Sequence, residues 1–475
     1  MPVRTGRARF DRRVPGTAPE TERRRRATVP DHQKSADSGA EPRRVVIVGS
    51  GFAGFTCARK LCRTLAAAGD DTEVVLVSPT DYMLYTPLLP DVAGGLIDPR
   101  FVAVSLTDAL PRVRLIVATA KSIDLDDKTL TVTSDHHGTR ELTWDRLVLT
   151  PGSVTRLFDV PGLPEHGRGL KTVAEALYLR EQLIRQLELA DHEDDSEIRQ
   201  ARRTVVVVGA SYAGTELVAQ LRALADTYAA RRGFDPSEIR FLLLDMADRV
   251  MPEVGEKLSD QVLSVLRGRG IDIRLGMSLK ELTGDRVVLT DGTTVPTHTV
   301  AWVTGVTGAP VLSTLDLPME RGRLSVNDDL RVPGHPDVFA GGDAAAVPDL
   351  TQPGKITPPT AQHATRQGKI LARNVAASLG IGAPVPYKHR DMGLVVDLGP
   401  RFAVANPLGL RLSGLPAKAV TRAYHTFAVP RGLNRWAITL TYLTNAVTPR
   451  PLPLLGLVSP EEASFHASEG IRHQV

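Results

Sequence analysis

The sequence contains one short design twice, and this repeat limits the fold more than any other feature. Residues 44–54 read RVVIVGSGFAG, and residues 202–216 read RRTVVVVGASYAGTE, about 160 positions later. Each copy is a run of β-branched apolar residues followed by closely spaced glycines, which predicts a buried parallel strand, a tight turn and a helix. We therefore predict an α/β protein with two doubly wound Rossmann-like nucleotide-binding domains, the second inserted within the first.

The first glycine loop has G-x-G-x-x-G spacing, and each glycine has a physical role. Gly49 permits the tight turn, Gly51 lets backbone amides approach a pyrophosphate, and Gly54 allows close packing of helix on strand. The predicted dinucleotide site consists of Gly49, Ser50, Gly51, Phe52, Ala53 and Gly54. The next strand ends in Ser78 rather than in an acid. A hydroxyl can accept bonds from the adenosine ribose, although less strongly than a carboxylate.

The second loop departs from the pattern at its middle glycine. The predicted site there consists of Gly209, Ser211, Tyr212, Ala213 and Gly214. The small Ser211 narrows the approach to a pyrophosphate without blocking it. The following strand ends in Asp245, which can bond a ribose diol and repel a 2′-phosphate, so NADH is favoured over NADPH. Arg249 is near enough in sequence to weaken that preference.

Composition and charge restrict the remaining function classes. Residues 1–44 contain twelve Arg and Lys against six Asp and Glu, so the net charge of +4 leaves about −2 for the rest of the chain. This nearly apolar-free tail, residues 1–43, is predicted to be disordered, and we expect no nucleic-acid partner. No stretch reaches the about eighteen apolar residues of a membrane span. Two cysteines and no signal peptide favour the cytoplasm.

The first glycine loop and four further segments form a recognisable set. They are the first glycine loop, SPTDYMLYTPLLP at 78–90, LVLTPGS at 147–153, DVFAGGDAAA at 337–346 and TPPTAQHATRQG at 357–368. Over residues 44–445 the chain resembles flavoproteins with two dinucleotide-binding domains, most closely the type II NADH dehydrogenases, which are NADH:quinone oxidoreductases. The resemblance implies FAD on the first loop, NADH on the second, and a quinone or another electron acceptor.

The resemblance also assigns roles to single residues. Asp343 would bind the flavin ribityl chain, with Gly342 allowing close passage. Thr360, Ala361 and Gln362 would begin a helix whose amides face the flavin and stabilise negative charge on it. Thr150 and Gly152 match the loop between the domains, and Gly305 would end a strand beneath the nicotinamide. Glu216 matches an acid beside both rings, although a first-turn carboxylate that complements the helix dipole explains it equally well.

The sequence departs from the family in two places. The second glutamine of the family's A-Q-x-x-x-Q quinone motif is Arg366, and the adjacent Gln367 lies about 100° away around a helix. In the C-terminal region, residues 415–428 place Val420, Tyr424 and Phe427 on one helical face. We favour packing of that face on the chain's own domain over peripheral contact with the inner face of the plasma membrane.

The two cysteines do not suggest thiol chemistry. Cys57 and Cys62 lie five residues apart in the first helix, about 140° around it, so we interpret them as buried helix thiols. We predict no metal site, since no histidines show ligand spacing. A soluble ferredoxin- or rubredoxin-type reductase and a non-catalytic flavin redox sensor remain alternatives, and a homodimer is left open.

The predicted order is a tail to residue 43, an FAD domain at 44–160 and 320–385, an NADH domain at 161–319, and a C-terminal interface or peripheral membrane region at 386–475.

Overall fold

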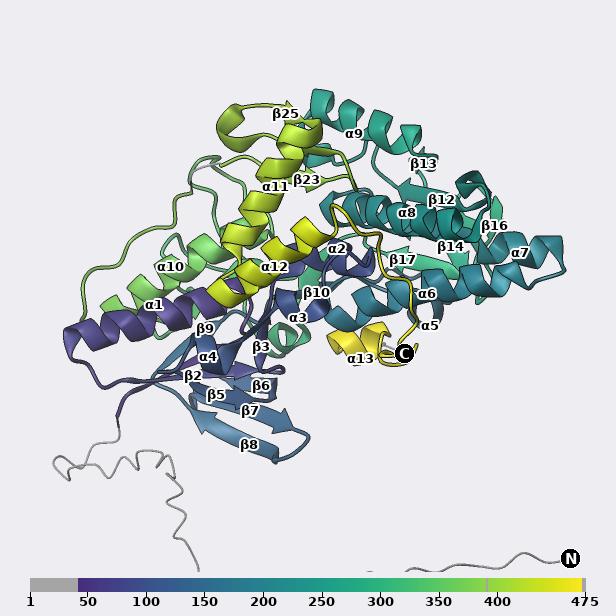
Figure 1. The fold of residues 1–475 in the computed structure, drawn as a ribbon. Helices are drawn as coiled ribbons and strands as arrows, with labels where there is room; N and C mark the ends of the chain where they lie inside the picture. The colour runs from purple at the N-terminus through teal and green to yellow at the C-terminus, as the bar shows by residue number, and fades with distance from the viewer. Residues whose placement is uncertain (1–41, 390–391, 472–475) are drawn as a thin grey trace, which may run out of the picture. The chain divides into compact units, whose positions relative to one another are not determined.

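Two parallel sheets organise the chain in the computed structural model, which describes residues 42–389 and 392–471 (Figure 1). The first sheet has five strands in the order β21-β9-β1-β2-β5, all parallel. They are β1 (Arg44–Val48), β2 (Glu73–Ser78), β5 (Arg114–Val117), β9 (Arg146–Leu149) and β21 (Val338–Ala340). The predicted basic tail lies almost wholly outside the described residues.

The second sheet lies between β9 and β21 in the sequence, as an inserted domain requires. Its parallel order is β13-β12-β11-β17. The strands are β11 (Thr204–Val208), β12 (Arg240–Asp245), β13 (Ile271–Leu275) and β17 (Thr299–Trp302). The four consecutive valines at 205–208 are fully buried, because both faces of a parallel sheet are covered. The prediction of two doubly wound domains is therefore confirmed.

Each glycine loop leads into a long helix, α1 (Phe52–Ala68) after β1 and α8 (Tyr212–Arg232) after β11. Helix α10 (Ala361–Ser378) packs along α1. A Cβ at Gly368 would lie 2.4 Å from the carbonyl oxygen of Ala53, so only glycine permits this approach. The packing fixes the start of α10 beside the first loop.

Antiparallel elements flank both sheets. A three-stranded meander accompanies each one, β6-β7-β8 in the first half and β14-β15-β16 in the second. The two halves are joined by a ribbon in which β10 (Ser153–Thr155) pairs with β18 (Val306–Gly308). The meander strands are β6 (Thr119–Asp124), β7 (Thr129–Ser134), β8 (Gly138–Thr143), β14 (Leu279–Leu282), β15 (Arg286–Leu289) and β16 (Thr294–Pro296).

The C-terminal part adds a small antiparallel sheet and three helices. The sheet contains β23 (Val395–Asp397), β24 (Ala403–Ala405) and β25 (Leu412–Ser413). Helix α11 (Gly414–Ala428) packs on this sheet, and α12 (Gly432–Thr444) follows it. Helix α13 (Phe465–Glu469) returns to the second half, where Phe465 joins the cluster around Trp302.

The other α-helices and strands connect these parts. They are β3 (Tyr82–Leu84), α2 (Leu89–Ala93), α3 (Pro99–Val102), β4 (Ala103–Ser105), α4 (Leu106–Ala109), α5 (Leu163–His166), α6 (Val173–Asp191), α7 (Ser196–Arg202), α9 (Glu256–Gly268), β19 (Met319–Glu320), β20 (Arg323–Ser325) and β22 (Ala345–Ala346). Within the described ranges, every helix is too short or too polar to cross a bilayer.

Candidate functional site

The first glycine loop is closed on one side and open on the other. Gly49 has a φ of +96°, and a Cβ there would lie 2.1 Å from the carbonyl oxygen of Thr150. A Cβ at Gly54 would lie 1.9 Å from the carbonyl oxygen of Gly49, whereas one at Gly51 would meet nothing within 4 Å. The tight side therefore fixes the turn, and the open side leaves room for a ligand at the end of α1.

Helices α1 and α8 both begin without a side-chain cap. Their N-cap residues, Gly51 and Ser211, accept no hydrogen bond through a side chain, and neither first turn contains an acid. The first-turn N–H groups lack intrahelical partners, and the helix dipole favours negative charge there. Each helix end therefore fits the diphosphate of a dinucleotide. The second loop is equally tight at its base, since a Cβ at Gly214 would lie 1.8 Å from the carbonyl oxygen of Gly209.

The residues predicted to bind the two riboses contact the glycine loops. The Ser78 hydroxyl is fully buried and lies 2.7 Å from the hydroxyl of Ser50. At the end of β12, the Asp245 carboxylate accepts hydrogen bonds from the backbone N–H groups of Ala210 (2.5 Å) and Ala247 (2.8 Å). Both side chains thus brace their loop, and their bonding to a ribose stays a prediction.

Asp343 follows β21, as predicted, and has polar neighbours from two other segments. Its carboxylate accepts a hydrogen bond from the hydroxyl of Ser153 (2.8 Å), and the Lys171 ammonium donates to the same hydroxyl (2.9 Å). The loop itself is held by Gln367, whose Oε1 accepts from the N–H of Gly342 (2.7 Å). Gln367 is therefore a buried structural residue, a role that the sequence analysis did not assign.

The helix predicted at residues 360–362 begins there. Thr360 is the N-cap of α10 and accepts from the N–H of His363. Gln362 donates to the carbonyl oxygen of Gly393 (3.3 Å) and accepts from the guanidinium of Arg366 (3.2 Å). The Tyr424 hydroxyl, on α11, lies beside Gln362: burial raises the pKa of this hydroxyl, and Arg366 and Gln362 act in the opposite direction. The arginine that replaces the family's second glutamine thus contacts the first one directly.

Glu216 lies in the second turn of α8, so the first-turn explanation of this residue is wrong. Its Oε1 accepts from the backbone N–H of Asp397 (2.8 Å), on β23. Burial raises the pKa of Glu216 well above its ordinary value, and the nearby carboxylates of Asp397 and Asp91 raise it further. Burial therefore favours the protonated form of this carboxyl group.

A buried cluster of charged and polar groups lies beside Glu216. The Lys418 ammonium contacts both carboxylate oxygens of Asp397, and Gln220 donates to Asp91 (2.6 Å) and, less closely, to Asp397 (3.3 Å). The Arg450 guanidinium donates to Oε1 of Gln220 (2.8 Å). Burial raises the pKa of Asp91 to about 7. No sequence pattern predicts this cluster, because its members lie on α2, α8, β23, α11 and the C-terminal segment.

Helix α11 faces the opposite way from our expectation. Lys418 points inward, and Arg422 lies with its guanidinium 4.7 Å from the ring centre of Tyr442. Val420 packs partly on the small sheet, but Phe427 is 71% exposed and Tyr424 39% exposed. The expected packing of this apolar face on the chain's own domain is therefore wrong for Tyr424 and Phe427, because the helix buries its polar side.

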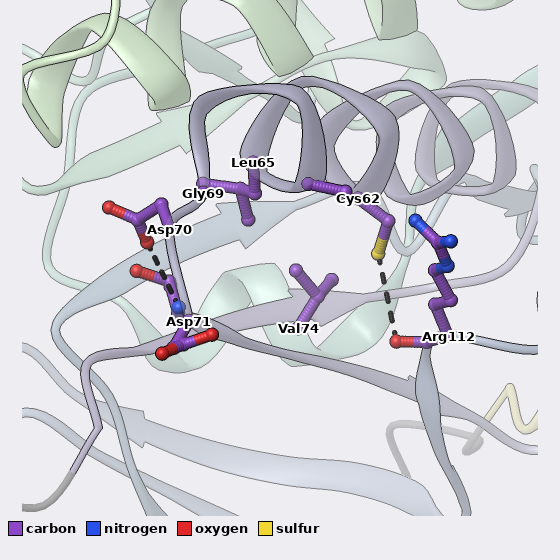
Figure 2. Close-up of a pocket in the computed structure, with 9 residues that line it drawn as sticks. Cys62, Leu65, Gly69, Asp70, Asp71, Val74 and Arg112 are labelled. Carbon is purple, nitrogen blue, oxygen red and sulfur yellow. Dashed lines mark hydrogen bonds between the residues drawn. The ribbon is translucent and has the colours of Figure 1, made fainter.

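The two cysteines are free thiols and do not form a redox pair. Cys57 is fully buried, whereas Cys62 is partly exposed in a surface pocket of about 270 Å³, so only the first is the buried thiol that we expected. Figure 2 shows Cys62 with its sulfur directed at the carbonyl oxygen of Arg112, 3.8 Å away. Burial raises the pKa of Cys62 to about 11, which disfavours the reactive thiolate.

Comparison with known proteins identifies the family. Residues 43–368 match the family model described as pyridine nucleotide-disulphide oxidoreductase. The type II NADH:quinone oxidoreductase Ndh of Mycobacterium tuberculosis is 30% identical over 399 residues, which cover 80% of this chain and 83% of that protein. The chain belongs to the type II NADH:quinone oxidoreductase family. FAD and NADH, the cofactors predicted from the sequence, are the cofactors of this oxidoreductase.

Other similar proteins agree with this assignment. Demethylphylloquinone reductase NdbB of Synechocystis is 28% identical over 407 residues, covering 84% of this chain and 96% of the relative. Among solved structures, NDH2 from Plasmodium falciparum in complex with NADH has a TM-score of 0.79 at 16% identity, covering 87% of this chain and all of that chain. This structural match supports the fold of the type II oxidoreductase.

Proposed function

We propose that the chain oxidises NADH through bound FAD and passes the electrons to a quinone that it reaches at a membrane surface. The proposal that the acceptor is a quinone rests on the position of Tyr424. Its ring is exposed on the apolar face of α11, and its hydroxyl lies beside Gln362 at the start of α10. One side chain therefore connects the proposed flavin site with the surface from which an apolar quinone would enter.

The chain's residues would hold two cofactors in contact. FAD would lie on the loop at 49–54 with its ribityl chain at Asp343, and NADH on the loop at 209–214. Bound together, the cofactors supply hydride transfer from the nicotinamide to the flavin. The N-terminal amides of α10 would stabilise negative charge at the flavin, and Glu216 would keep a proton beside the two rings.

Contact with the membrane is supported by the outward faces of α11 and α12. Trp436 is 76% exposed, and several leucines of α12 are also exposed. Leu433, Leu440 and Leu443 lie with Trp436 on this helix, and Leu415 lies with Phe427 on α11. Large apolar side chains gathered on neighbouring helices are typical of a protein that lies on a bilayer. We place this contact at the cytoplasmic face of the plasma membrane.

The test compares acceptors and one matched pair of variants. We expect the flavin-loaded enzyme to oxidise NADH with a short-chain quinone far faster than with ferredoxin or rubredoxin. Tyr424→Phe removes the hydroxyl that lies beside Gln362, so quinone kcat/KM should fall about fivefold, the effect of losing one hydrogen-bonding group. Reduction of the flavin by NADH, followed by stopped flow, should not change in this variant.

Tyr178→Phe, on α6, removes the hydroxyl of a partly buried tyrosine in the inserted half of the chain and serves as the control. The proposal fails if ferredoxin is the preferred acceptor, or if the two variants have the same effect on quinone turnover.

A further inference from the structure

A chain of hydrogen bonds leads from Lys171 to the carboxylate that would hold the flavin ribityl group. The Lys171 ammonium donates to the hydroxyl of Ser153 (2.9 Å), and this hydroxyl lies 2.8 Å from Oδ2 of Asp343. An ammonium can only donate, so the single hydroxyl proton of Ser153 points at Asp343. In the described part of the chain, Oδ1 of Asp343 accepts no hydrogen bond, so it can accept one from a ligand hydroxyl.

The backbone of Lys171 is held by a buried glutamate at the start of α6. Oε2 of Glu175 accepts from the N–H groups of Lys171 (2.7 Å) and Thr172 (2.9 Å), and the Thr172 hydroxyl accepts from the N–H of Glu175 (3.2 Å). This arrangement is a reciprocal capping box, and Glu175 has no exposed surface. The position of Lys171 therefore depends on Glu175.

Helix α13 brings a second carboxyl group to Glu175 from the C-terminal segment. A Cβ at Gly169 would lie 2.5 Å from Oε1 of Glu175 and 3.0 Å from Oε1 of Glu469, so the two oxygens face the same point. The Ser468 hydroxyl also donates to Oε1 of Glu175 (3.1 Å). Oε2 of Glu469 accepts from the N–H of Thr155 (2.5 Å), on β10. Helix α13 thus meets both the start of α6 and the strand β10 (Figure 1).

A single proton between the two carboxyl groups would complete their hydrogen bonding. Oε1 of Glu469 is buried, and within the described ranges it accepts no hydrogen bond. Two facing carboxylates repel each other, whereas a carboxylic acid donates to a carboxylate and satisfies both oxygens. The pKa of Glu175 is raised to about 8, first by burial and then by Glu469, while the N–H groups of Lys171 and Thr172 oppose the shift. Neutral pH therefore favours the shared proton, and alkali removes it.

Other ionisable groups surround the pair. The Arg168 guanidinium, just before α6, donates to the carbonyl oxygens of Gly167 (2.6 Å) and Pro460 (3.0 Å) and lies 5.1 Å from the ring centre of Tyr178. A guanidinium stays charged in mild alkali, and burial raises the pKa of the Tyr178 hydroxyl above its ordinary value. Neither group therefore changes charge near the pKa of Glu175. The remaining charged or titratable side chains of the neighbouring segments are Lys171, Asp343, Glu461 and His466.

We propose that Glu469 is a positioning residue of the flavin site, which shares one proton with Glu175 and so keeps Lys171 and Ser153 in place to orient Asp343. The inference rests on the proposed role of Asp343 at the ribityl chain and extends the flavin site to the C-terminal helix. Loss of the proton leaves two carboxylates face to face, and their repulsion separates α13 from the start of α6. The Ser153 hydroxyl is then free to turn away from Asp343, and the affinity for FAD falls.

The experiment titrates flavin-free protein with FAD and follows flavin fluorescence between about pH 6.5 and about pH 9.5. We expect the dissociation constant of the wild type to rise on the order of tenfold across this range, the effect of one charge-assisted hydrogen bond. Glu469→Gln cannot ionise but keeps both contacts, because its amide oxygen accepts from Thr155 and its amide nitrogen donates to Glu175. Its dissociation constant should stay near the neutral-pH value of the wild type throughout.

Two further substitutions test the chain at its other end. Lys171→Met should weaken FAD binding about tenfold at neutral pH, and Lys171→Arg, which keeps a charged donor, should restore most of the affinity. Glu197→Gln, at an exposed glutamate of α7, is the matched loss of a carboxylate and should keep the wild-type pH profile. Circular dichroism at each pH reports the fold independently of the flavin.

Three results would overturn the proposal. They are a wild-type dissociation constant that does not change with pH, an equal alkaline loss of affinity in the wild type and in Glu469→Gln, and wild-type affinity in Lys171→Met. Turnover with a short-chain quinone at neutral pH is measured in parallel. If the flavin-loaded wild type does not reduce the quinone, the proposed function fails, but the inference about FAD binding stands.

Discussion

The ammonium group of Lys418 contacts both carboxylate oxygens of Asp397, and both side chains are almost completely buried. The pair joins α11 to β23. The backbone N–H of the same aspartate donates to Glu216, so the ion pair also fixes the strand that holds the proposed proton carrier. Removing one partner of a buried ion pair leaves an uncompensated buried charge, so this contact should be sensitive to substitution.

Removing one member of that pair should destabilise the protein more than removing both. Lys418→Met leaves the Asp397 carboxylate buried without its cation, and we expect the free energy of unfolding to fall by about 3–5 kcal/mol. Lys418→Met/Asp397→Asn should recover most of this loss, because no uncompensated charge remains. Chemical denaturation monitored by flavin and tryptophan fluorescence measures both. Lys369→Met, at an exposed lysine of α10, is the control. If Lys418→Met/Asp397→Asn is no more stable than Lys418→Met, the uncompensated charge is not the cause of the loss.

Acid should destabilise the fold through His425. Burial lowers the pKa of this imidazole to about 4, with Lys418 acting in the same direction and Asp397 opposing it. In the unfolded chain its pKa is about 6.5, so between these values the unfolded state binds the extra proton. Stability therefore rises with pH across this window and is lost as the pH falls from about 6.5 to about 4, by roughly 3 kcal/mol.

The pH dependence can be assigned by substitution. His425→Gln should flatten the dependence of the melting temperature on pH between about 4 and 6.5 relative to wild type. Asp91 acts with the opposite sign, because its raised pKa of about 7 makes the folded state hold the extra proton. Asp91→Asn should therefore steepen the loss of stability in acid. Identical pH profiles for His425→Gln and wild type would show that the imidazole is not the group responsible.

Alanine substitutions at two glycines of the first loop should have different effects, one on stability and the other on flavin binding. Gly54→Ala places a Cβ against the carbonyl oxygen of Gly49, so the melting temperature of flavin-free protein should fall. Gly51→Ala meets no protein atom, so the melting temperature should stay constant while bound flavin, measured by absorbance, decreases. Gly268→Ala, at the end of α9, has open space and should change neither quantity. Normal flavin content in Gly51→Ala would show that the diphosphate does not approach this loop.

Asp245 should determine the choice between NADH and NADPH. Asp245→Asn keeps the size of the side chain and removes the charge that would repel a 2′-phosphate. We expect the ratio of kcat/KM for NADPH to that for NADH to rise roughly tenfold, or about 1.4 kcal/mol. Asp260→Asn, on the exposed side of α9, is the matched loss of charge and should leave the ratio unchanged. A preference for NADPH in the wild type would also contradict the assignment.

Local sequence patterns predicted the architecture because the constraints there are local. The valines before Gly49 and Gly209, the apolar residues of β21 and the threonine that caps α10 each act on their own segment, and each lies where it was expected. The buried cluster around Gln220 could not be found in this way. Its partners Asp91, Asp397 and Arg450 come together only through tertiary packing, and each one taken alone resembles a solvent-exposed charge.

The orientation of α11 was predicted incorrectly for a related physical reason. Periodicity identified the apolar face correctly, but which face points inward depends on what the helix meets. Here Lys418 meets Asp397, whereas Phe427 is mostly exposed and Tyr424 is only partly covered. A sequence pattern cannot distinguish the two cases, because an apolar stripe has the same spacing whether it faces a protein core or a bilayer.

The ribbon of β10 and β18 holds the two ends of the inserted stretch next to each other. Ser153 and Gly308 are directly paired in it, so the chain leaves the first half and returns to it at neighbouring points. Because the two ends of the intervening stretch are adjacent, this stretch can be replaced without changing the distance between the residues that flank it. Replacing the stretch between these two residues with the corresponding stretch of a protein that prefers another coenzyme would therefore transfer that coenzyme preference in one step.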